Sequence, residues 1–159
     1  MAHKLSPSAQ RVQDALWGAG YQNQVMEHTQ TTRSAREAAQ AIGCSVAQIV
    51  KSLIFRTQDT HRPVLVLASG PNRVNETHLG ELMLEAIERA DPDFVQTVTG
   101  FAIGGVPPVG HRSAMTTFID ENLMPLAEIW AAGGTPNAVF KLTPAEMAAM
   151  TGGQVVSIK

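Results

Sequence analysis

Two apolar runs in the first half of the chain most constrain its fold: IVKSLIF at residues 49–55 and PVLVLAS at residues 63–69. Both are rich in valine, isoleucine and leucine, and a polar segment, RTQDTHR, joins them. Runs of this composition with a short polar connection are typical of a β-hairpin. Because IVKSLIF is apolar on both of its faces, we expect the two strands to pair as antiparallel neighbours at the centre of a sheet.

Capping and turn residues divide the rest of the chain into short helices and strands. The candidate caps of the second helix are Thr31, Thr32 and Ser34, and Ser45 with Gln48 predicts a capping box. Helices are predicted over residues 6–20, 34–43, 75–87, 91–100, 125–134 and 143–153. Further strands are predicted over residues 21–28, 101–106, 116–123, 138–142 and 154–159.

Length and composition fit a single domain that spans residues 1–159. A chain of 159 residues, 44% of them hydrophobic, can bury a substantial core. Hairpin-like links between the expected strands outnumber helical crossovers. We therefore expect an α/β fold of the α+β kind, with a mixed, mostly antiparallel sheet of about six or seven strands and helices around it.

Several classes of protein are excluded by composition. No window approaches eighteen consecutive apolar residues and the first residues, MAHKLSPSAQ, lack the apolar run of a signal peptide, so we expect a cytoplasmic protein with no membrane contact. The single cysteine, Cys44, has no disulfide partner, which fits a reducing compartment. A net charge of -2 argues against a protein that coats long nucleic acid, so DNA is not an expected partner.

The common catalytic and cofactor motifs are absent from the sequence. It contains no GxSxG elbow, no phosphate-binding P-loop, no HExxH pair and no dinucleotide fingerprint. The five histidines, at positions 3, 28, 61, 78 and 111, do not have metal-ligand spacing. We therefore expect neither a metal nor a cofactor, and three unusual features remain.

The first feature is Lys51, which lies inside the apolar run 49–55. A lysine in a strand usually points to solvent as part of the polar alternation. Here the residues on both faces of the strand are apolar, so the alternative is a fixed cation in a pocket, suited to a phosphate or an ester. Both interpretations stay open on the strand pattern alone.

The second feature is GGVPPVGH at residues 104–111, a segment that can neither continue a helix nor sit inside a sheet. It can be a rigid corner between strands. Alternatively, Gly104 and Gly105 let the backbone approach a ligand while Pro107 and Pro108 hold the amides ready for a developing oxyanion. The third feature, AAGG at residues 131–134, is either a helix C-cap with a spare glycine or small residues beside a pocket.

Taken in order, these segments resemble the YbaK-like family of aminoacyl-tRNA deacylases, relatives of the editing domain of some prolyl-tRNA synthetases. The resemblance rests on IVKSLIF, PVLVLASGPNRVN, TGFAIGGVPPVGH, FID, AAGG and AVFKLTPAEM, and it covers nearly the whole chain. It implies a free-standing domain that hydrolyses the ester of mischarged tRNA, most often proline tRNA carrying alanine, cysteine, serine, threonine or 2-aminobutyrate. The implied partner is the acceptor 3′-end of that tRNA, with a prolyl-tRNA synthetase as a further candidate.

The resemblance also implies catalytic roles for four residues. Lys51 matches the family's strand lysine, which holds the terminal adenosine. Gly104 and Pro108 match the family's GxxxP loop around the aminoacyl carbonyl, and Gly105 lies inside that loop. The implied mechanism uses a water molecule, oriented by the free ribose hydroxyl, and needs no side chain as a general base.

Five further residues are expected to bind the substrate. Ser52 follows the lysine at a position associated with substrate choice, and Gly133 with Gly134 matches a glycine pair beside the amino-acid pocket. Ala132 stands where relatives carry a polar residue. His111 either contacts RNA or caps the turn.

Two other functions stay open on the sequence. The domain can be a binding module that has lost turnover and recognises a nucleotide or a tRNA end, or it can hydrolyse another small ester. Four arginines, Arg33, Arg36, Arg73 and Arg112, are candidates for contacts with acceptor-end phosphates, although scattered arginines are usually solvated surface.

Overall fold

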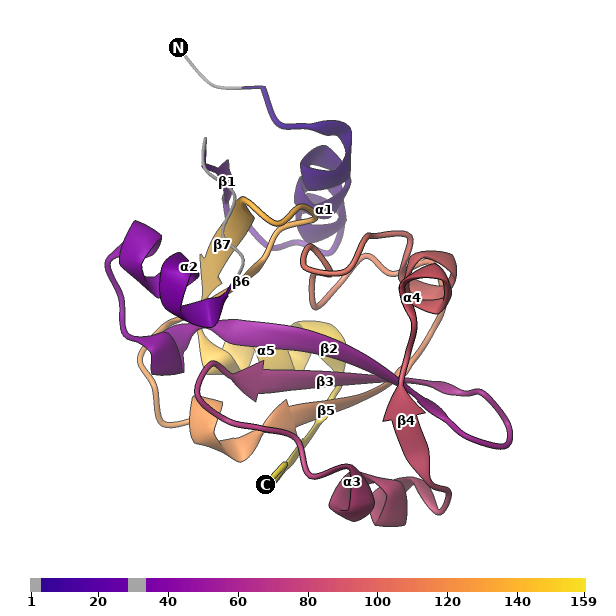
Figure 1. The fold of residues 1–159 in the computed structure, drawn as a ribbon. Coiled ribbons are helices and arrows are strands. Elements are labelled where there is room, and N and C mark those ends of the chain that lie inside the picture. The colour runs from indigo at the N-terminus through magenta and orange to yellow at the C-terminus, as the bar shows by residue number, and fades with distance from the viewer. Residues whose placement is uncertain (1–3, 29–33) are drawn as a thin grey trace.

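The computed structural model describes residues 4–28 and 34–159, which form two β-sheets and five helices around them (Figure 1). The helices are α1 (Pro7–Gly18), α2 (Ala35–Ile42), α3 (Glu76–Met83), α4 (Pro92–Thr99) and α5 (Pro144–Thr151). The strands are β1 (Val25–Glu27), β2 (Val50–Thr57), β3 (Pro63–Ser69), β4 (Ile87–Arg89), β5 (Thr116–Asp120), β6 (Ile129–Ala132), β7 (Ala138–Leu142) and β8 (Gln154–Val156). The expected α+β class is confirmed, with the strands divided between two sheets.

The larger sheet has the order β4-β2-β3-β5-β8, and the hairpin predicted from the two apolar runs is its β2–β3 pair. The pairing is antiparallel, with Lys51 opposite Ala68 and Phe55 opposite Val64. The β3–β5 and β5–β8 pairs are parallel, so the sheet is mixed. The smaller sheet, β1-β7-β6, is antiparallel throughout.

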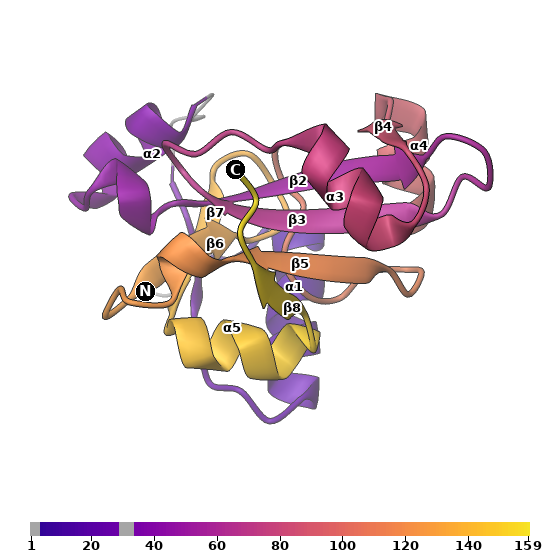
Figure 2. The same ribbon diagram turned by 90° about the horizontal axis from the view of Figure 1, so that it is seen from below.

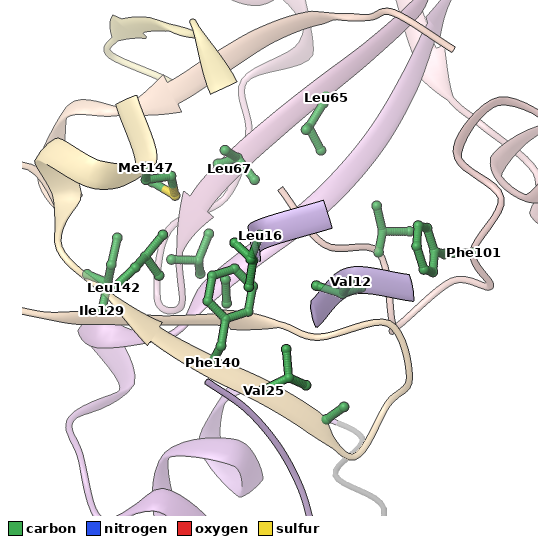
Figure 3. Packing of buried hydrophobic residues seen from close by; sticks show 14 of the residues in the cluster. Val12, Leu16, Val25, Leu65, Leu67, Phe101, Ile129, Phe140, Leu142 and Met147 are labelled. Carbon is green, nitrogen blue, oxygen red and sulfur yellow. The ribbon is translucent and has the colours of Figure 1, made fainter. Parts of the chain in front are cut away.

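The two faces of the larger sheet carry separate clusters of buried side chains. The small sheet and α1 lie on one face and α3 on the other, as the two views show (Figures 1 and 2). On the first face, Val12 and Leu16 of α1 pack with Phe140 and Leu67 (Figure 3). Residues of both sheets share this cluster, so the small sheet is fixed to the larger one by a common core.

Side-chain caps begin several helices where the sequence predicts them. Asp91 accepts a hydrogen bond from the Phe94 amide at 2.8 Å, and Asn75 accepts one from the His78 amide at 3.1 Å. Thr143 and Glu146 form a capping box at the start of α5. Ser34 caps α2, whereas Thr31 and Thr32, expected as caps, lie outside the described residues. These bonds satisfy amides that the helix itself leaves unpaired.

Two of the predicted elements are wrong. Residues 125–134, expected as a helix, contain β6, in which buried Ile129 and Ala131 alternate with half-buried neighbours and pair with β7. Residues 101–106, expected as a strand, form a turn, because Gly104 adopts a φ of 91° and the Gly105 amide bonds to the Ala102 carbonyl at 3.0 Å. The segment 131–134 is therefore not a helix C-cap.

A third difference concerns the end of α3. The helix stops at Met83, and Leu84 adopts a left-handed φ of 60°, so that Ile87–Arg89 can form β4 instead of a last helical turn. Along the described ranges 4–28 and 34–159, no helix is long and apolar enough to cross a membrane.

Candidate functional site

A pocket of about 310 Å³ lies where β2, α2, the turn after α4 and the small sheet meet. Its lining includes Lys51 and Ser52 of β2, Gly104 and Val106 of the turn, and Ala132 of β6. The structure therefore brings together four of the nine predicted site residues, from three segments far apart in the sequence. Most of the remaining wall is aliphatic.

Lys51 is half-buried and held at the edge of this pocket. Its Nζ donates a hydrogen bond to the Asn72 carbonyl oxygen at 2.6 Å. Asn72 is fixed in turn by Asp120, whose Oδ2 accepts from the Asn72 amide side chain at 2.8 Å. Burial lowers the pKa of Lys51, and the positive charges of Arg73 and Arg89 lower it further, whereas Asp120 raises it. The positive charges of Lys51, Arg73 and Arg89 together favour an anionic ligand near this residue, although the Asp120 carboxylate partly offsets them.

Two residues that line the pocket each have a buried polar atom without a hydrogen-bond partner among the described residues. These atoms are the hydroxyl oxygen of Ser52 and the indole Nε1 of Trp130. Buried polar groups in proteins are nearly always paired, and each unpaired group costs about 1–3 kcal/mol. Because both residues line the pocket, the two atoms are candidates for hydrogen bonds to a ligand.

The turn that faces β2 offers main-chain donors. Val106 is buried, and the Gly104 and Val106 amides donate no hydrogen bond within the described part of the chain. The positive φ of Gly104 is a conformation that side chains with a Cβ rarely adopt. Gly104 and Val106 both line the pocket, so these unpaired amides are the candidate donors to a carbonyl oxygen of a ligand.

His111 is hydrogen-bonded to the main chain of the same turn. Its Nε2 lies 2.6 Å from the Pro107 carbonyl oxygen, so this nitrogen carries the proton and donates it. Burial lowers the pKa of His111, although the bond to Pro107 opposes that effect. Neither His111 nor the buried Pro108 lines the pocket. The geometry corresponds to the turn-capping alternative for His111.

The other predicted glycines are packing positions outside the pocket lining. A Cβ on Gly105 would lie 2.8 Å from the carbonyl carbon and oxygen of Gly134, and one on Gly134 would lie 2.6 Å from the Ser8 carbonyl oxygen. The Gly133 amide donates to the Ala138 carbonyl at 2.7 Å. These contacts fasten the 101–108 turn to the β6–β7 turn, and that turn to α1.

Sequence reasoning missed two residues of this region. Arg11 of α1 donates from Nη2 to the Gly100 carbonyl at 2.7 Å and stacks 4.4 Å from the centre of the Phe101 ring, so it anchors the start of the turn. No sequence signal identifies this contact. Trp130 was missed because a helix was predicted at residues 125–134. Only a strand at 129–132 places Trp130 beside Ile49, the residue before β2.

Three of the four candidate arginines are exposed, and none of these three is among the residues that line the pocket. Arg36, Arg73 and Arg112 are exposed and make no ion pair within the described ranges, and Arg33 lies outside the described residues. In the part of the chain that the structure describes, no three His, Cys, Asp or Glu side chains are grouped closely enough to hold a metal ion.

Comparisons with known proteins agree on one family. Residues 29–150 match the family model of an aminoacyl-tRNA editing domain. A crystal structure of a candidate trans-editing enzyme for prolyl tRNA synthetase superimposes with a TM-score of 0.93 and 48% identity, covering 98% of this chain and 99% of that one.

Curated relatives are more distant. The uncharacterized protein YwhH of Bacillus subtilis is 29% identical over 126 residues, which are 79% of this chain and 80% of the relative. The proline–tRNA ligase of Bacillus licheniformis is 33% identical over 107 residues, 64% of this chain. The match spans only 18% of that ligase, so the similarity concerns one part of a much longer protein.

Proposed function

The chain belongs to the aminoacyl-tRNA editing domain family, and from that premise we propose that it is a free-standing deacylase that hydrolyses the ester of mischarged tRNA. The proposed substrate is proline tRNA that carries a small non-cognate amino acid, namely alanine, serine, cysteine, threonine or 2-aminobutyrate. The whole chain, residues 1–159, would act as one editing domain. The single observation that carries the proposal is the pocket that Lys51 shares with the free amides of Gly104 and Val106.

The proposed reaction is the addition of water to the aminoacyl carbonyl carbon. The carbonyl oxygen becomes an oxyanion, which the Gly104 and Val106 amides would stabilise as preorganised donors. The ester bond then breaks, the ribose oxygen takes a proton, and the products are a free amino acid and a tRNA with an unmodified 3′-end. The roles of Gly105 and Pro108 in this scheme are indirect, because both hold the turn in place.

No side chain is assigned as a general base. The described residues that line the pocket include no histidine, cysteine or carboxylate. Lys51 and Ser52 are adjacent in one strand and so point to opposite faces, which argues against a nucleophilic serine activated by that lysine. We therefore assign the orientation of the water to the free hydroxyl of the terminal ribose, a group that RNA supplies and DNA lacks.

Lys51 is proposed to bind the terminal nucleotide of the tRNA through the negative charge of that nucleotide's phosphate. The nearby positive charges of Arg73 and Arg89 support an anionic group at this edge of the pocket. Selection among amino acids would depend on size, because a pocket of about 310 Å³ with aliphatic walls distinguishes small side chains by volume. Ala132 and Ser52 are the two of the five predicted substrate-binding residues that line this space.

The test is a panel of proline tRNAs charged with alanine, serine, cysteine, threonine, 2-aminobutyrate or proline, each incubated with catalytic amounts of the protein. We expect at least one small amino acid to be released with multiple turnovers and prolyl-tRNA to be spared. Alanine on its own cognate tRNA is the matched control for recognition of the tRNA body. Release no faster than the spontaneous rate from every member of the panel would contradict the proposal.

A further inference from the structure

One edge of β2 lacks a neighbouring strand beside the pocket. On that side β4 pairs only with Phe55, Arg56 and Thr57. At the other end, Ile49 forms an isolated bridge with Trp130. Between these two contacts, no strand of the described residues pairs with this edge of β2.

The direction in which the Ser52 N–H and C=O point follows from the backbone hydrogen bonds of two later residues of β2. The Ile54 carbonyl accepts from the Ala90 amide at 3.1 Å, on the side of β4, whereas the Thr57 amide donates to the Arg62 carbonyl at 3.0 Å, on the side of β3. In a strand, the N–H and C=O of one residue point to the same side, and successive residues alternate. Ser52, two residues before Ile54, therefore directs both its N–H and its C=O to the open edge.

This open edge borders the pocket. Ser52 and its neighbours Val50, Lys51 and Leu53 all contribute to the lining. The Ser52 hydroxyl, which projects from a face of the strand and not from its edge, is also buried and without a partner among the described residues.

We propose that the aminoacyl group binds Ser52 as a single added β-residue. Its α-ammonium group donates to the Ser52 carbonyl, and its ester carbonyl accepts from the Ser52 N–H. A residue that exchanges both bonds with one partner is the hydrogen-bonded pair of an antiparallel ladder, and strand addition at a free sheet edge is a known mode of peptide recognition. This inference rests on the proposed deacylase function and specifies how that site recognises its substrate.

The antiparallel direction places the rest of the substrate. Because the ester carbonyl lies at the Ser52 N–H, the ribose continues toward the beginning of β2, on the side of Lys51 and of the Ile49–Trp130 bridge. The amino-acid side chain lies on the same face of the strand as the Ser52 hydroxyl, as it does for paired residues of a sheet. Ser52 therefore recognises the amino acid by its main chain and limits its side chain by the hydroxyl.

The inference requires a free α-amino group on the substrate. The closing experiment first compares proline tRNA esterified with alanine and with propionate, which lacks only that amino group. The acceleration over the spontaneous rate is compared, since the two esters differ in intrinsic reactivity. We expect the acceleration to fall at least about tenfold for the propionyl ester, because the Ser52 carbonyl is left buried without its donor.

A second arm tests the Ser52 N–H. Replacing Ser52 by its α-hydroxy acid converts that single N–H into an ester oxygen and keeps the side chain, and Ser52→Ala removes the hydroxyl and keeps the N–H. For the protein with the backbone ester at residue 52, we expect kcat/KM to fall at least about tenfold while the circular dichroism spectrum stays native. Because the group faces the open edge, no bond to β3 is lost.

The outcomes separate the two proposals. If the wild-type protein releases alanine while the propionyl ester and the backbone ester both keep their accelerations within about threefold, edge binding is overturned and the deacylase function stands. If the wild type releases none of the small amino acids, the function is overturned and edge binding with it. Should the backbone ester fail to fold, the propionyl comparison, made on the unmodified protein, decides the question by itself.

Discussion

The two ends of β2 differ in how their polar groups are satisfied. At the hairpin end, Glu85 accepts from the Asp59 and Thr60 amides at 2.8 and 2.7 Å and from the Thr60 hydroxyl at 2.7 Å. The neighbouring Arg56 bonds to Glu88 at 3.0 Å. At the pocket end, the Ser52 hydroxyl has no partner within the described residues, and its main chain faces an unpaired edge.

The contrast shows that one strand can have paired polar groups at one end, which stabilise the fold, and unpaired polar groups at the other end, which are available for binding. Paired groups lower the free energy of the folded chain, whereas groups left unpaired at a pocket raise it and are satisfied by a ligand. Substitutions at the hairpin end should therefore change stability without changing deacylation. Substitutions of the β2 and β6 side chains that line the pocket should change deacylation with little change in stability, whereas a substitution in the packed turns beside the pocket should change both. The following predictions test this division, from the largest effect to the smallest.

Lys51→Ala should reduce deacylation of mischarged proline tRNA by at least about a hundredfold, because it removes the charge proposed to hold the terminal nucleotide. The unfolding free energy should change by no more than about 1 kcal/mol, because the loss of the hydrogen bond to the Asn72 carbonyl is offset by removal of a charge that burial disfavours. Lys141→Ala is the matched control: Lys141 is an exposed residue of β7, paired with Glu128 at 3.6 Å. Wild-type activity in Lys51→Ala would show that the Lys51 charge at the pocket end of β2 takes no part in deacylation.

Gly105→Ala should lower the unfolding free energy by about 1–3 kcal/mol, because the new Cβ meets the Gly134 main chain at 2.8 Å and one of the two turns must shift. Deacylation should fall as well, since Gly104 and Val106 flank this position. Gly18→Ala, where a Cβ has no neighbour within 4 Å, is the control and should leave both quantities nearly unchanged. Urea unfolding measures the first quantity, and an unchanged midpoint for Gly105→Ala would show that the turns are not tightly packed.

Glu85→Gln tests the hairpin end through pH. Hydrogen bonds from the Thr60 amide and hydroxyl lower the pKa of Glu85 to about 2 from 4.5. A carboxylate with a lowered pKa stabilises the fold above its unfolded value and loses that contribution as the pH falls through the folded value. The melting temperature of the variant should therefore lie below that of the wild type at pH 7, and the gap should close between pH 4.5 and pH 2. Deacylation at neutral pH should match the wild type; a large loss would mean that the two ends are coupled.

Trp130→Phe should have the smallest effect on stability. The indole N–H has no hydrogen bond to lose among the described residues, so the unfolding free energy should change by less than about 1 kcal/mol. Because Trp130 lines the pocket, KM for mischarged tRNA should rise by about three- to tenfold if that N–H donates to the substrate. Steady-state kinetics distinguish this outcome from an unchanged KM, which would assign Trp130 a packing role alone.

Local signals made much of the fold predictable. The β2–β3 hairpin and the caps at Asp91 and Thr143 depend on residues close together in the sequence, and the structure contains them all. The strand β6 was not predictable, because AEIWAA is compatible with a helix and becomes a strand through its pairing with β7. Long-range pairing of this kind overrides local preference.

The site was predictable in part for the same reason. Lys51 and Gly104 stand out by residue type and context, and they line one pocket. The packing of Gly134 against Ser8 and the direction of the Ser52 main chain depend on tertiary neighbours that no local pattern encodes.

The most direct test of the account is the response of individual backbone amides to a non-hydrolysable substrate analogue, adenosine carrying alanine through a 3′-amide. In a ¹H–¹⁵N correlation spectrum, we expect saturable shifts at Ser52, Gly104 and Val106, and none at Asp59 or Thr60 in the hairpin end. Shifts confined to the hairpin end, or no shifts at the pocket when the analogue is in large excess, would contradict it.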